Sequence, residues 1–525
     1  MKTYKKLLLK ALVIGLVVTS CTNDFDTLNS SPNSPVKVPS TTLMVNAQFR
    51  LCQDIRDEWF SGRMVLPWVQ YWAQLNYTEE DRYQYRENSN NDTWKAVYTD
   101  LMDLQRIVEL NTDEATKGDM LAYGANQNQI AAARILKTWV FNLLTDTYGP
   151  IPYHSVGTTD PDFQALNATT GVIGPVYAPM DKIYKDMIKE LKEAAAQIDV
   201  TKPAFTEGDV LLNGDATAWK KFANSLRLRL AMHMRAKDKA FADQNIAEAI
   251  AGGLMTSNDD NAVVEFESTA TNSSPMYQAF IVSARTDFGV AMPFIDLLKG
   301  IKGPFPGKVD PRLFIYAAPR GTKVADVATG NFTAGTPDQY EGQPYGVENH
   351  IASAALKPVY PSLPFAPIQA TFGEVFMEYA EVCFLMSEYN NWDQAWYEKG
   401  IRASMERWGV PAASIDAYIA GLPAASEATV RTQKYIALYM QPHEAWTEYR
   451  RTGYPKTLVM PNTTYTSSAG TVYSFVPLVV DAKDLPDRIG FSQSEQLLNV
   501  DGYKSGVEKL GGADNMLTKL WLFKK

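Results

Sequence analysis

Tyrosines in polar surroundings are the residues of this chain best suited to hold a ligand. Residues 59–94 contain nine aromatic residues, whereas the chain average of 11% would give about four. Three of them, Tyr77, Tyr83 and Tyr85, lie in the polar run NYTEEDRYQYRENSNNDT, which has no apolar face, so we expect them to be exposed. A rigid aromatic ring near a few polar groups can pack against the C–H face of a sugar ring. The run therefore predicts part of a ligand-binding face.

Two further groups of residues could contribute to the same chemistry. Tyr277, Arg285 and Asp287 combine one ring with two charges, and Tyr340 and Tyr345 follow in a stretch without helical periodicity. Arg285 could pair with the carboxylate of a peptide or with that of an acidic sugar. The ligand class therefore stays open between glycan and peptide.

Other aromatic residues fit a helical stripe and are predicted to belong to the core. Trp68, Tyr71 and Trp72 share one helical face, and Trp219 and Trp446 lie on apolar stripes of later helices. We expect these five side chains to be buried and to serve the scaffold.

The N-terminus has the pattern of a bacterial lipoprotein. Residues 1–20 begin with lysines and continue with the apolar run Leu7–Val18, which is shorter than the about 20 residues that a membrane-spanning helix needs. Val18-Thr19-Ser20-Cys21 resembles a lipobox, in which the cysteine thiol receives a diacylglycerol. We therefore predict a signal peptide over 1–20, lipidation at Cys21 and a polar tether over 21–40. The alternative is an ordinary secretory peptide with an unrelated cysteine.

Catalytic and metal-binding motifs are missing from the sequence. There is no nucleotide-binding loop and no G-x-S-x-G elbow, and Thr447 stands where a zinc-protease helix starting at His443-Glu444 would need its second histidine. With three cysteines and four histidines, we predict no metal and no cofactor. A net charge of −9 without a basic run argues against nucleic acid. Carboxylate pairs that only folding can form leave a helical-barrel glycosidase as the enzyme alternative.

Helical periodicity predicts an all-α fold. Four amphipathic helix pairs are expected, with the first pair beginning at an N-cap at Asp92-Thr93 and ending at the Gly149-Pro150 terminator. Residues 257–370 lack this periodicity and are read as a long irregular insertion, and Thr471–Val480 resembles a strand. Because helix pairs return after the insertion, we expect one domain over 41–525, of tetratricopeptide-like helical-pair type. Cys52 and Cys383 could form a disulfide or remain buried thiols.

Four groups of short motifs resemble the SusD/RagB family of outer-membrane nutrient-binding lipoproteins, in particular its SusD-like branch. They extend from the tether to residue 455, and their order makes the resemblance specific. They are Pro32-Asn33-Ser34-Pro35; Ala132-Ala133-Arg134 with Thr145-Asp146-Thr147-Tyr148-Gly149-Pro150; Trp219-Lys220-Lys221-Phe222 with Asp310-Pro311-Arg312-Leu313; and Tyr397-Glu398-Lys399-Gly400 with Glu444-Ala445-Trp446-Thr447-Glu448-Tyr449-Arg450-Arg451.

The resemblance implies a function as well as a fold. Proteins of this family are anchored by lipid at the outer face of the outer membrane, are not enzymes, and hold a glycan or peptide for a SusC-like TonB-dependent outer-membrane transporter. The family does not fix ligand residues by motif, so the ligand face rests on the aromatic residues alone. A purely structural helical adaptor is a further alternative.

Overall fold

Long helices dominate the computed structural model, which describes residues 38–167, 171–354 and 359–524. The predicted signal peptide, the lipidation site Cys21 and nearly all of the predicted tether lie outside the described residues. From Ser40 onward the chain forms one compact unit. The predicted all-α fold of helix pairs with an irregular insertion is confirmed.

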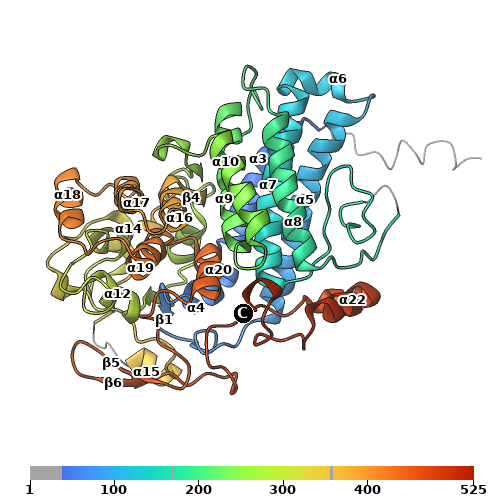
Figure 1. Ribbon diagram of the computed structural model, residues 1–525. Helices are drawn as coiled ribbons and strands as arrows, with labels where there is room; N and C mark the ends of the chain where they lie inside the picture. Colours follow the sequence, from blue (N-terminus) through green and yellow to red (C-terminus); the bar gives the residue numbers. More distant parts are fainter. Residues whose placement is uncertain (1–37, 168–170, 355–358, 525) are drawn as a thin grey trace, which may run out of the picture. The chain divides into compact units, whose positions relative to one another are not determined.

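Six long helices form the first part of this unit, coloured blue to green in Figure 1. Each packs against the next along the chain, although long connections join α3 to α5 and α7 to α8. They are α3 (Ser40–Ile55), α5 (Glu87–Thr112), α7 (Asn126–Tyr148), α8 (Met180–Gln197), α9 (Ala216–Met234) and α10 (Lys239–Gly252). The short helix α6 (Lys117–Met120) lies in the connection between α5 and α7.

The start of α5 differs from the prediction. The helix begins at Glu87, so the predicted N-cap at Asp92-Thr93 is wrong. Its polar first turns are held by tertiary hydrogen bonds, because the Tyr148 hydroxyl donates to Asn90 Oδ1 at 2.7 Å and Asn90 Nδ2 donates to the Gly490 carbonyl at 3.0 Å. Both partners are distant in sequence, which explains why a local capping signal placed the helix start too late.

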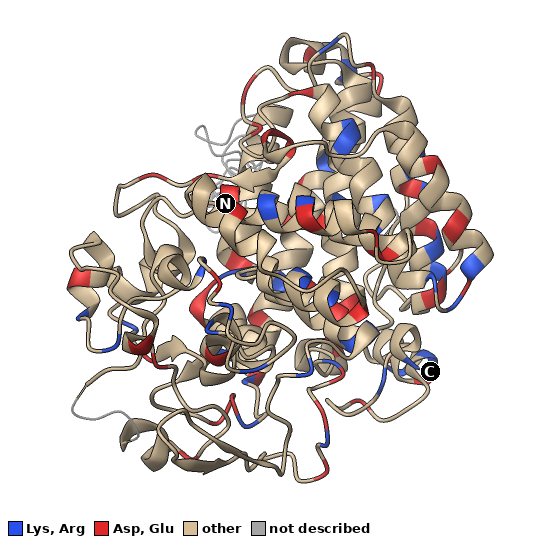
Figure 2. Ribbon diagram, turned by 60° about the vertical axis from the view of Figure 1, so that its left-hand side comes forward, with Lys and Arg blue, Asp and Glu red and all other residues tan. Residues whose placement is uncertain are grey.

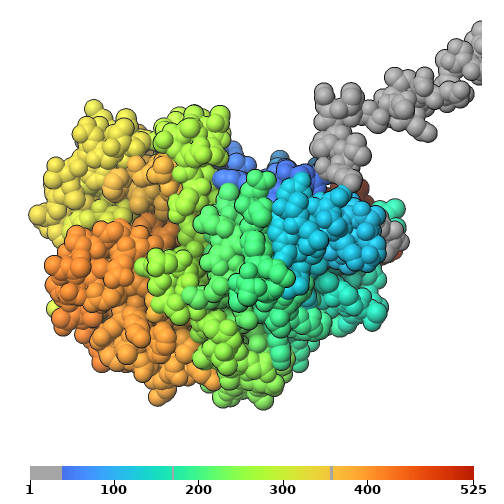
Figure 3. Space-filling model, turned by 90° about the horizontal axis from the view of Figure 1, so that it is seen from above, coloured from blue at the N-terminus to red at the C-terminus, as the bar shows by residue number. Residues whose placement is uncertain are grey.

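A second group of helices, orange in Figures 1 and 3, contains the third and fourth predicted pairs. Helix α16 joins it to the first group by packing against α9, and the space-filling view shows the yellow and orange segments beside the green helices. The helices are α16 (Tyr379–Tyr389), α17 (Gln394–Arg407), α18 (Ala412–Ala420), α19 (Glu427–Ala437) and α20 (Pro442–Thr452). Basic and acidic residues are interspersed along the helices (Figure 2).

Short elements lie before α5, in and directly after the insertion, and in the C-terminal tail. Three two-stranded antiparallel sheets are described, pairing β1 with β3, β2 with β4, and β5 with β6. The strands are β1 (Trp72–Gln74), β2 (Ala262–Val264), β3 (Phe288–Val290), β4 (Glu374–Met377), β5 (Thr464–Thr466) and β6 (Val472–Ser474). The remaining short helices are α4 (Leu66–Trp68), α11 (Pro275–Tyr277), α12 (Met292–Leu298), α13 (Leu313–Tyr316), α14 (Val324–Thr329), α15 (Asn349–Ala354), α21 (Gln493–Leu498) and α22 (Val500–Leu510).

The predicted core aromatics are buried. Trp68, Tyr71, Trp72, Trp219 and Trp446 are all completely inaccessible to solvent, which confirms that they belong to the core. Their polar atoms are satisfied, as burial requires: the Trp219 indole N–H donates to an Asp209 carboxylate, and that of Trp446 donates to the Pro486 carbonyl. The shared helical face predicted for Trp68, Tyr71 and Trp72 is wrong, because α4 ends at Trp68 and Trp72 begins β1.

The two remaining cysteines, Cys52 and Cys383, are buried free thiols, so the alternative of a disulfide between them does not hold. Across the described ranges, no helix combines the length and apolar character needed to cross a membrane.

Candidate functional site

Pairing of β1 with β3 brings two of the predicted ligand-face segments together. The register places Gln74 opposite Phe288, and the Leu75 N–H donates to the Asp287 carbonyl at 2.6 Å. Tyr77 follows β1, while Arg285 and Asp287 precede β3. Residues that are more than 200 positions apart in the sequence thus meet at one end of a short sheet.

The centre of this region is Trp59, which lies in the π-helical segment η1 (Glu58–Val65) and is half-buried. Two guanidinium groups approach its ring: Cζ of Arg63 is 5.0 Å from the ring centroid and Cζ of Arg285 is 5.2 Å away. The sequence marked Trp59 only as one of nine aromatic residues. The position of Arg63, four residues after Trp59 and about one helical turn away, could have indicated that the two side chains meet. That spacing does not reveal whether the Trp59 ring is exposed.

Arg63 supports the rings from inside the protein. Its side chain is only 2% exposed, and Nη2 donates to Asp287 Oδ2 at 2.9 Å while Nη1 lies 4.0 Å from Glu80 Oε2. Cζ is also 5.9 Å from the Tyr77 ring centroid. Among the described residues, Nε and Nη1 have no hydrogen-bond acceptor. Both atoms are shielded from solvent, so Arg63 acts on this face by supporting the two rings and not by contacting a ligand.

A groove of about 490 Å³ opens beside Trp59. Its walls come from the loop before η1 and from the first turns of α5, and its lining is Asp57, Trp59, Arg86, Glu87, Asn88, Ser89, Asp92 and Thr93. Asp57 accepts a hydrogen bond from the Phe60 N–H at 2.8 Å, but burial dominates and raises its pKa to about 7. Glu80 connects the groove to the rings, because it pairs with both Arg86 and Arg63. One aromatic wall thus faces several donors and acceptors of hydrogen bonds.

The structure supports the expected exposure of some predicted site residues. Tyr77 is 54% exposed, and its backbone N–H donates to Asn349 Oδ1 at 2.8 Å. Tyr85 is half-buried, and burial raises its pKa. Tyr277 is half-buried at the end of α11, and within the described part of the chain no hydrogen bond joins its side chain to Trp59 or Arg285. The cluster therefore combines Tyr77, Arg285 and Asp287.

Three predicted ligand tyrosines are not exposed, so the exposure prediction is wrong for Tyr83, Tyr340 and Tyr345. Each is at most 1% exposed. Tyr83 and Tyr345 both pack edge-on against Phe475, at centroid distances of 5.2 and 5.3 Å. The Tyr340 hydroxyl donates to the Ala334 carbonyl at 2.7 Å. The polar residues that flank Tyr83 and Tyr345 in the sequence gave no indication of Phe475, which lies far along the chain and provides the apolar surface that buries both rings.

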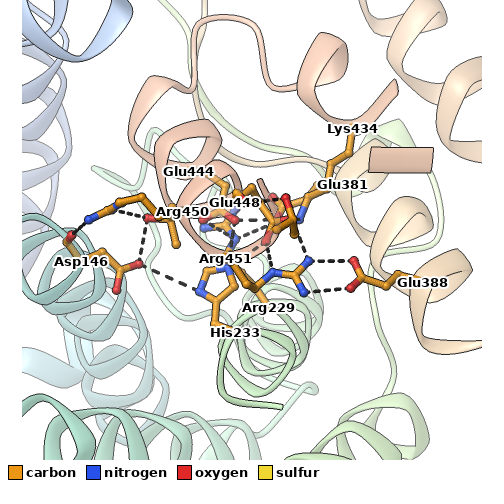
Figure 4. Close-up of polar contacts among 12 residues, drawn as sticks. Asp146, Arg229, His233, Glu381, Glu388, Lys434, Glu444, Glu448, Arg450 and Arg451 are labelled. Carbon is orange, nitrogen blue, oxygen red and sulfur yellow. Dashed lines mark hydrogen bonds and ion pairs between the residues drawn. The ribbon is translucent and has the colours of Figure 1, made fainter. Parts of the chain in front are cut away.

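A second charged cluster lies deep between α7, α9, α16, α19 and α20, and we call it the buried hub (Figure 4). Its labelled members are Asp146, Arg229, His233, Glu381, Glu388, Lys434, Glu444, Glu448, Arg450 and Arg451. Arg229 pairs with Glu381 and Glu444, and Arg451 pairs with Glu388 and Glu448. His233 lies between Glu444 and Glu448, and no sequence motif indicated it.

His233, Glu444 and Glu448 could in principle ligate a metal ion, since their ligand atoms lie within 4.8 Å of one another. The surrounding charges argue against this. Burial opposes a charge on His233, but Glu444 and Glu448 outweigh it and raise the pKa to about 9, so the imidazole is protonated at neutral pH and offers no lone pair. Lys434 Nζ also lies 3.2 Å from Glu448 Oε2. The positive charge that a metal would bring is already supplied by side chains.

Comparison with known proteins shows the same fold. A structure described as a chitin-binding protein has a TM-score of 0.71 at 24% identity and covers 93% of this chain and 100% of its own. A chitin-binding SusD homolog from Flavobacterium johnsoniae has a TM-score of 0.68 at 23% identity, covering 93% and 98%. A SusD homolog from Parabacteroides distasonis has a TM-score of 0.71 at 21% identity, covering 92% and 97%. No curated protein matches the chain significantly.

Two family descriptions match the sequence itself. Residues 426–523 match "Susd and RagB outer membrane lipoprotein". Residues 32–474, most of the chain, match the SusD-like family described as "Starch-binding associating with outer membrane". The chain therefore belongs to the SusD-like family.

Proposed function

We propose that this chain is a lipid-anchored binding protein of the outer membrane that holds a nutrient glycan at the face formed by Trp59, Tyr77 and the adjoining groove. The observation that carries this proposal is the combination of accessible rings, held by a buried arginine, with a groove rich in hydrogen-bonding side chains. A pyranose offers apolar C–H faces and a rim of hydroxyl groups, which such a surface matches.

Relatives support a glycan as the ligand. Two similar structures are described as chitin-binding, and the family description mentions starch. The groove offers amide, hydroxyl and carboxylate groups from Asn88, Ser89 and Asp92, which can both donate to and accept from sugar hydroxyls. These groups suit a neutral or N-acetylated sugar.

A peptide is the second candidate, and one observation favours it. Within the described residues Arg285 forms no ion pair with a carboxylate, although it lies against Trp59. An unpaired guanidinium beside an accessible ring would bind a peptide carboxylate or an acidic sugar.

Delivery to a SusC-like TonB-dependent transporter completes the proposal. The family descriptions place its members at the outer membrane, and lipidation of Cys21 would anchor this chain there, facing the exterior. We propose binding without catalysis. The carboxylates of Glu388, Glu444 and Glu448 in the buried hub are paired with cations, and each side chain is at most 9% exposed. No observation favours the glycosidase or a purely structural adaptor.

Calorimetric titration of Trp59→Ala tests the ligand face. Neutral tetrasaccharides of N-acetylglucosamine, glucose, mannose and xylose, together with tetrapeptides, serve as probes. We expect the variant to lose binding of the probe at this face. Trp396→Ala is a matched control, because Trp396 is also half-buried but lies on α17 against Lys399. Unchanged binding by Trp59→Ala would remove this face from the proposal.

Membrane fractionation tests the anchor and the partner. Cys21→Ala should leave the membrane fraction or accumulate unprocessed, and mild detergent extraction of the unmodified protein should recover a large β-barrel protein with it. Membrane retention of the variant at the unmodified level contradicts the anchor, and repeated recovery of the lipoprotein without a coexpressed barrel contradicts the transporter partner.

A further inference from the structure

A cleft of about 780 Å³ lies in a different part of the molecule from the Trp59 groove. It is bounded by the loop before α9, by β2, by the turn before β4, and by the end of α17. No residue lines both the cleft and the groove. Its volume falls within the about 300–1,000 Å³ that small-ligand sites occupy.

The deeper wall of the cleft is rigid and apolar. Trp408 stacks on Phe372 with a centroid distance of 5.8 Å and an interplanar angle of 30°, and it packs edge-on against Tyr316 at 4.7 Å. Ile315 continues the apolar wall. Since Trp408 and Phe372 are each at most 9% exposed, neighbouring rings fix them before any ligand arrives.

Charge in the wall is balanced. Cζ of Arg407 lies 4.7 Å from the Trp408 ring centroid, and its Nε is 3.2 Å from Glu378 Oε2, a carboxylate that is 1% exposed. Arg407 Nη2 also points to the Gly373 carbonyl at 3.4 Å. The guanidinium is therefore committed to protein partners, in contrast to Arg285 at the Trp59 face.

Polar groups at the rim are available. Asn213, Glu265 and Thr371 are exposed, and within the described ranges their side chains form no hydrogen bond or ion pair. The indole N–H of Trp408 is buried and has no hydrogen-bond acceptor among the described residues. The cleft thus combines an apolar wall with uncommitted amide, hydroxyl and carboxylate groups.

We propose that this cleft is a second binding site, for a neutral oligosaccharide of a few rings. The choice of a glycan as the ligand rests on the proposed function, whereas the existence of the site is inferred from the volume and lining of the cleft. Sugar hydroxyl groups both donate and accept hydrogen bonds, so they can pair with the amide, hydroxyl and carboxylate groups of the rim. The apolar C–H faces of sugar rings can pack against Phe372 and Ile315. Glu265, the one charge without an opposite partner here, disfavours anionic ligands. Two sites on one chain would hold a long glycan more tightly than either alone.

Calorimetry with four proteins separates the two sites, with neutral tetrasaccharides of N-acetylglucosamine, glucose, mannose and xylose as probes. Thr371→Trp fills the rim of the cleft, and Thr466→Trp, at an exposed position on β5, is the matched control. We expect two bound tetrasaccharides per unmodified chain, one for Trp59→Ala, none for Trp59→Ala/Thr371→Trp, and one for Trp59→Ala/Thr466→Trp. Thermal melts should be alike.

The outcomes distinguish the second site from the proposed function. One bound tetrasaccharide that Trp59→Ala abolishes overturns the second site and keeps the proposed function. One that survives Trp59→Ala but is lost in Trp59→Ala/Thr371→Trp keeps the cleft and overturns the Trp59 face. Retention of one site in the Trp59→Ala/Thr371→Trp protein overturns the placement of the second site. Absence of binding by every probe overturns both.

Discussion

The buried hub and the Trp59 face contain the same kinds of charged side chains but pair them differently. In the hub, Arg229, His233, Lys434 and Arg451 each form ion pairs with at least two carboxylates. At the Trp59 face, the buried Arg63 also pairs with two carboxylates, Asp287 and Glu80, but the half-buried Arg285 has no carboxylate partner within the described residues.

This difference separates scaffold from binding surface. A buried charge costs several kcal/mol unless partners compensate it, so the hub pairs its cations with carboxylates or, for Arg450, with the backbone carbonyls of Asp146 and Asp487. A partly exposed cation is stabilised by water and can stay unpaired until a ligand replaces that water. Completeness of pairing, rather than the presence of charge, therefore indicates which cluster serves the fold.

The largest expected effect breaks the scaffold next to the hub. Trp446 is completely buried, its indole N–H donates to the Pro486 carbonyl at 2.7 Å, and Arg450 Cζ lies 3.7 Å from its ring centroid. Trp446→Ala should lower the free energy of unfolding by roughly 3–5 kcal/mol through the cavity it leaves. Chemical denaturation measures this. Any ligand affinity should be unchanged in the folded fraction, and a loss below about 1 kcal/mol would contradict the scaffold role.

The hub itself should show a pH signature. Because the pKa of His233 is raised from 6.5 to about 9 in the folded protein, its protonated form contributes about 3 kcal/mol below pH 6.5. That contribution disappears as the pH rises through 9. His233→Gln should therefore destabilise the protein strongly at pH 6 and much less at pH 10, measured by denaturation at both values. His350→Gln is the control, since His350 is exposed; a pH-independent difference for His233→Gln would rule out this linkage.

Local signals explain why most of the scaffold was predictable. Apolar residues at helical spacing predicted α7, α8, α9 and α16, and Gly149 with Pro150 marked the end of α7. These features depend on neighbours within a few turns. The start of α5 was misplaced because Asn90 bonds to Tyr148 and Gly490, contacts that no local pattern contains.

The candidate site was predictable only in part, for the same reason. Tyr77, Arg285 and Asp287 meet because β1 pairs with β3, and this pairing could not be inferred from either segment alone. Tyr83 and Tyr345 both pack against the Phe475 ring. Because Phe475 is distant in sequence, the polar residues around the two tyrosines wrongly suggested that they are exposed. Trp59 was overlooked because its exposure is set by tertiary packing rather than by its helical position.

A smaller effect should separate exposed from buried tyrosines of the same sequence run. Tyr77→Ala should weaken ligand binding by about 1–3 kcal/mol if its ring is a contact hot spot, with the free energy of unfolding changed by about 0.5 kcal/mol or less. Tyr83→Phe keeps a buried ring whose hydroxyl has no hydrogen-bond partner among the described residues, so it should leave affinity unchanged. Titration and thermal melts of both variants provide the test, and equal affinity losses would undo the distinction.

The smallest expected effect concerns the unpaired cation. Arg285→Gln removes a charge that faces Trp59 without removing any ion pair within the described part of the chain. A half-exposed guanidinium interacts with a carboxylate through water-screened attraction worth about 1 kcal/mol or less. The variant should bind an acidic oligosaccharide up to about fivefold more weakly at low salt, and this difference should fade at 1 M salt, where the screening length is about 3 Å.

Neutral tetrasaccharides supply the internal control, because uncharged hydroxyls gain little from a cation that is already hydrated. Their affinity should change less than twofold in Arg285→Gln. Arg402→Gln gives the matched surface control, since Arg402 pairs with Asp416 on an exposed helix face. If Arg285→Gln weakened neutral and acidic ligands equally at every salt concentration, Arg285 would act by holding the Trp59 ring in place, and the open charge at this face would no longer distinguish it from the hub.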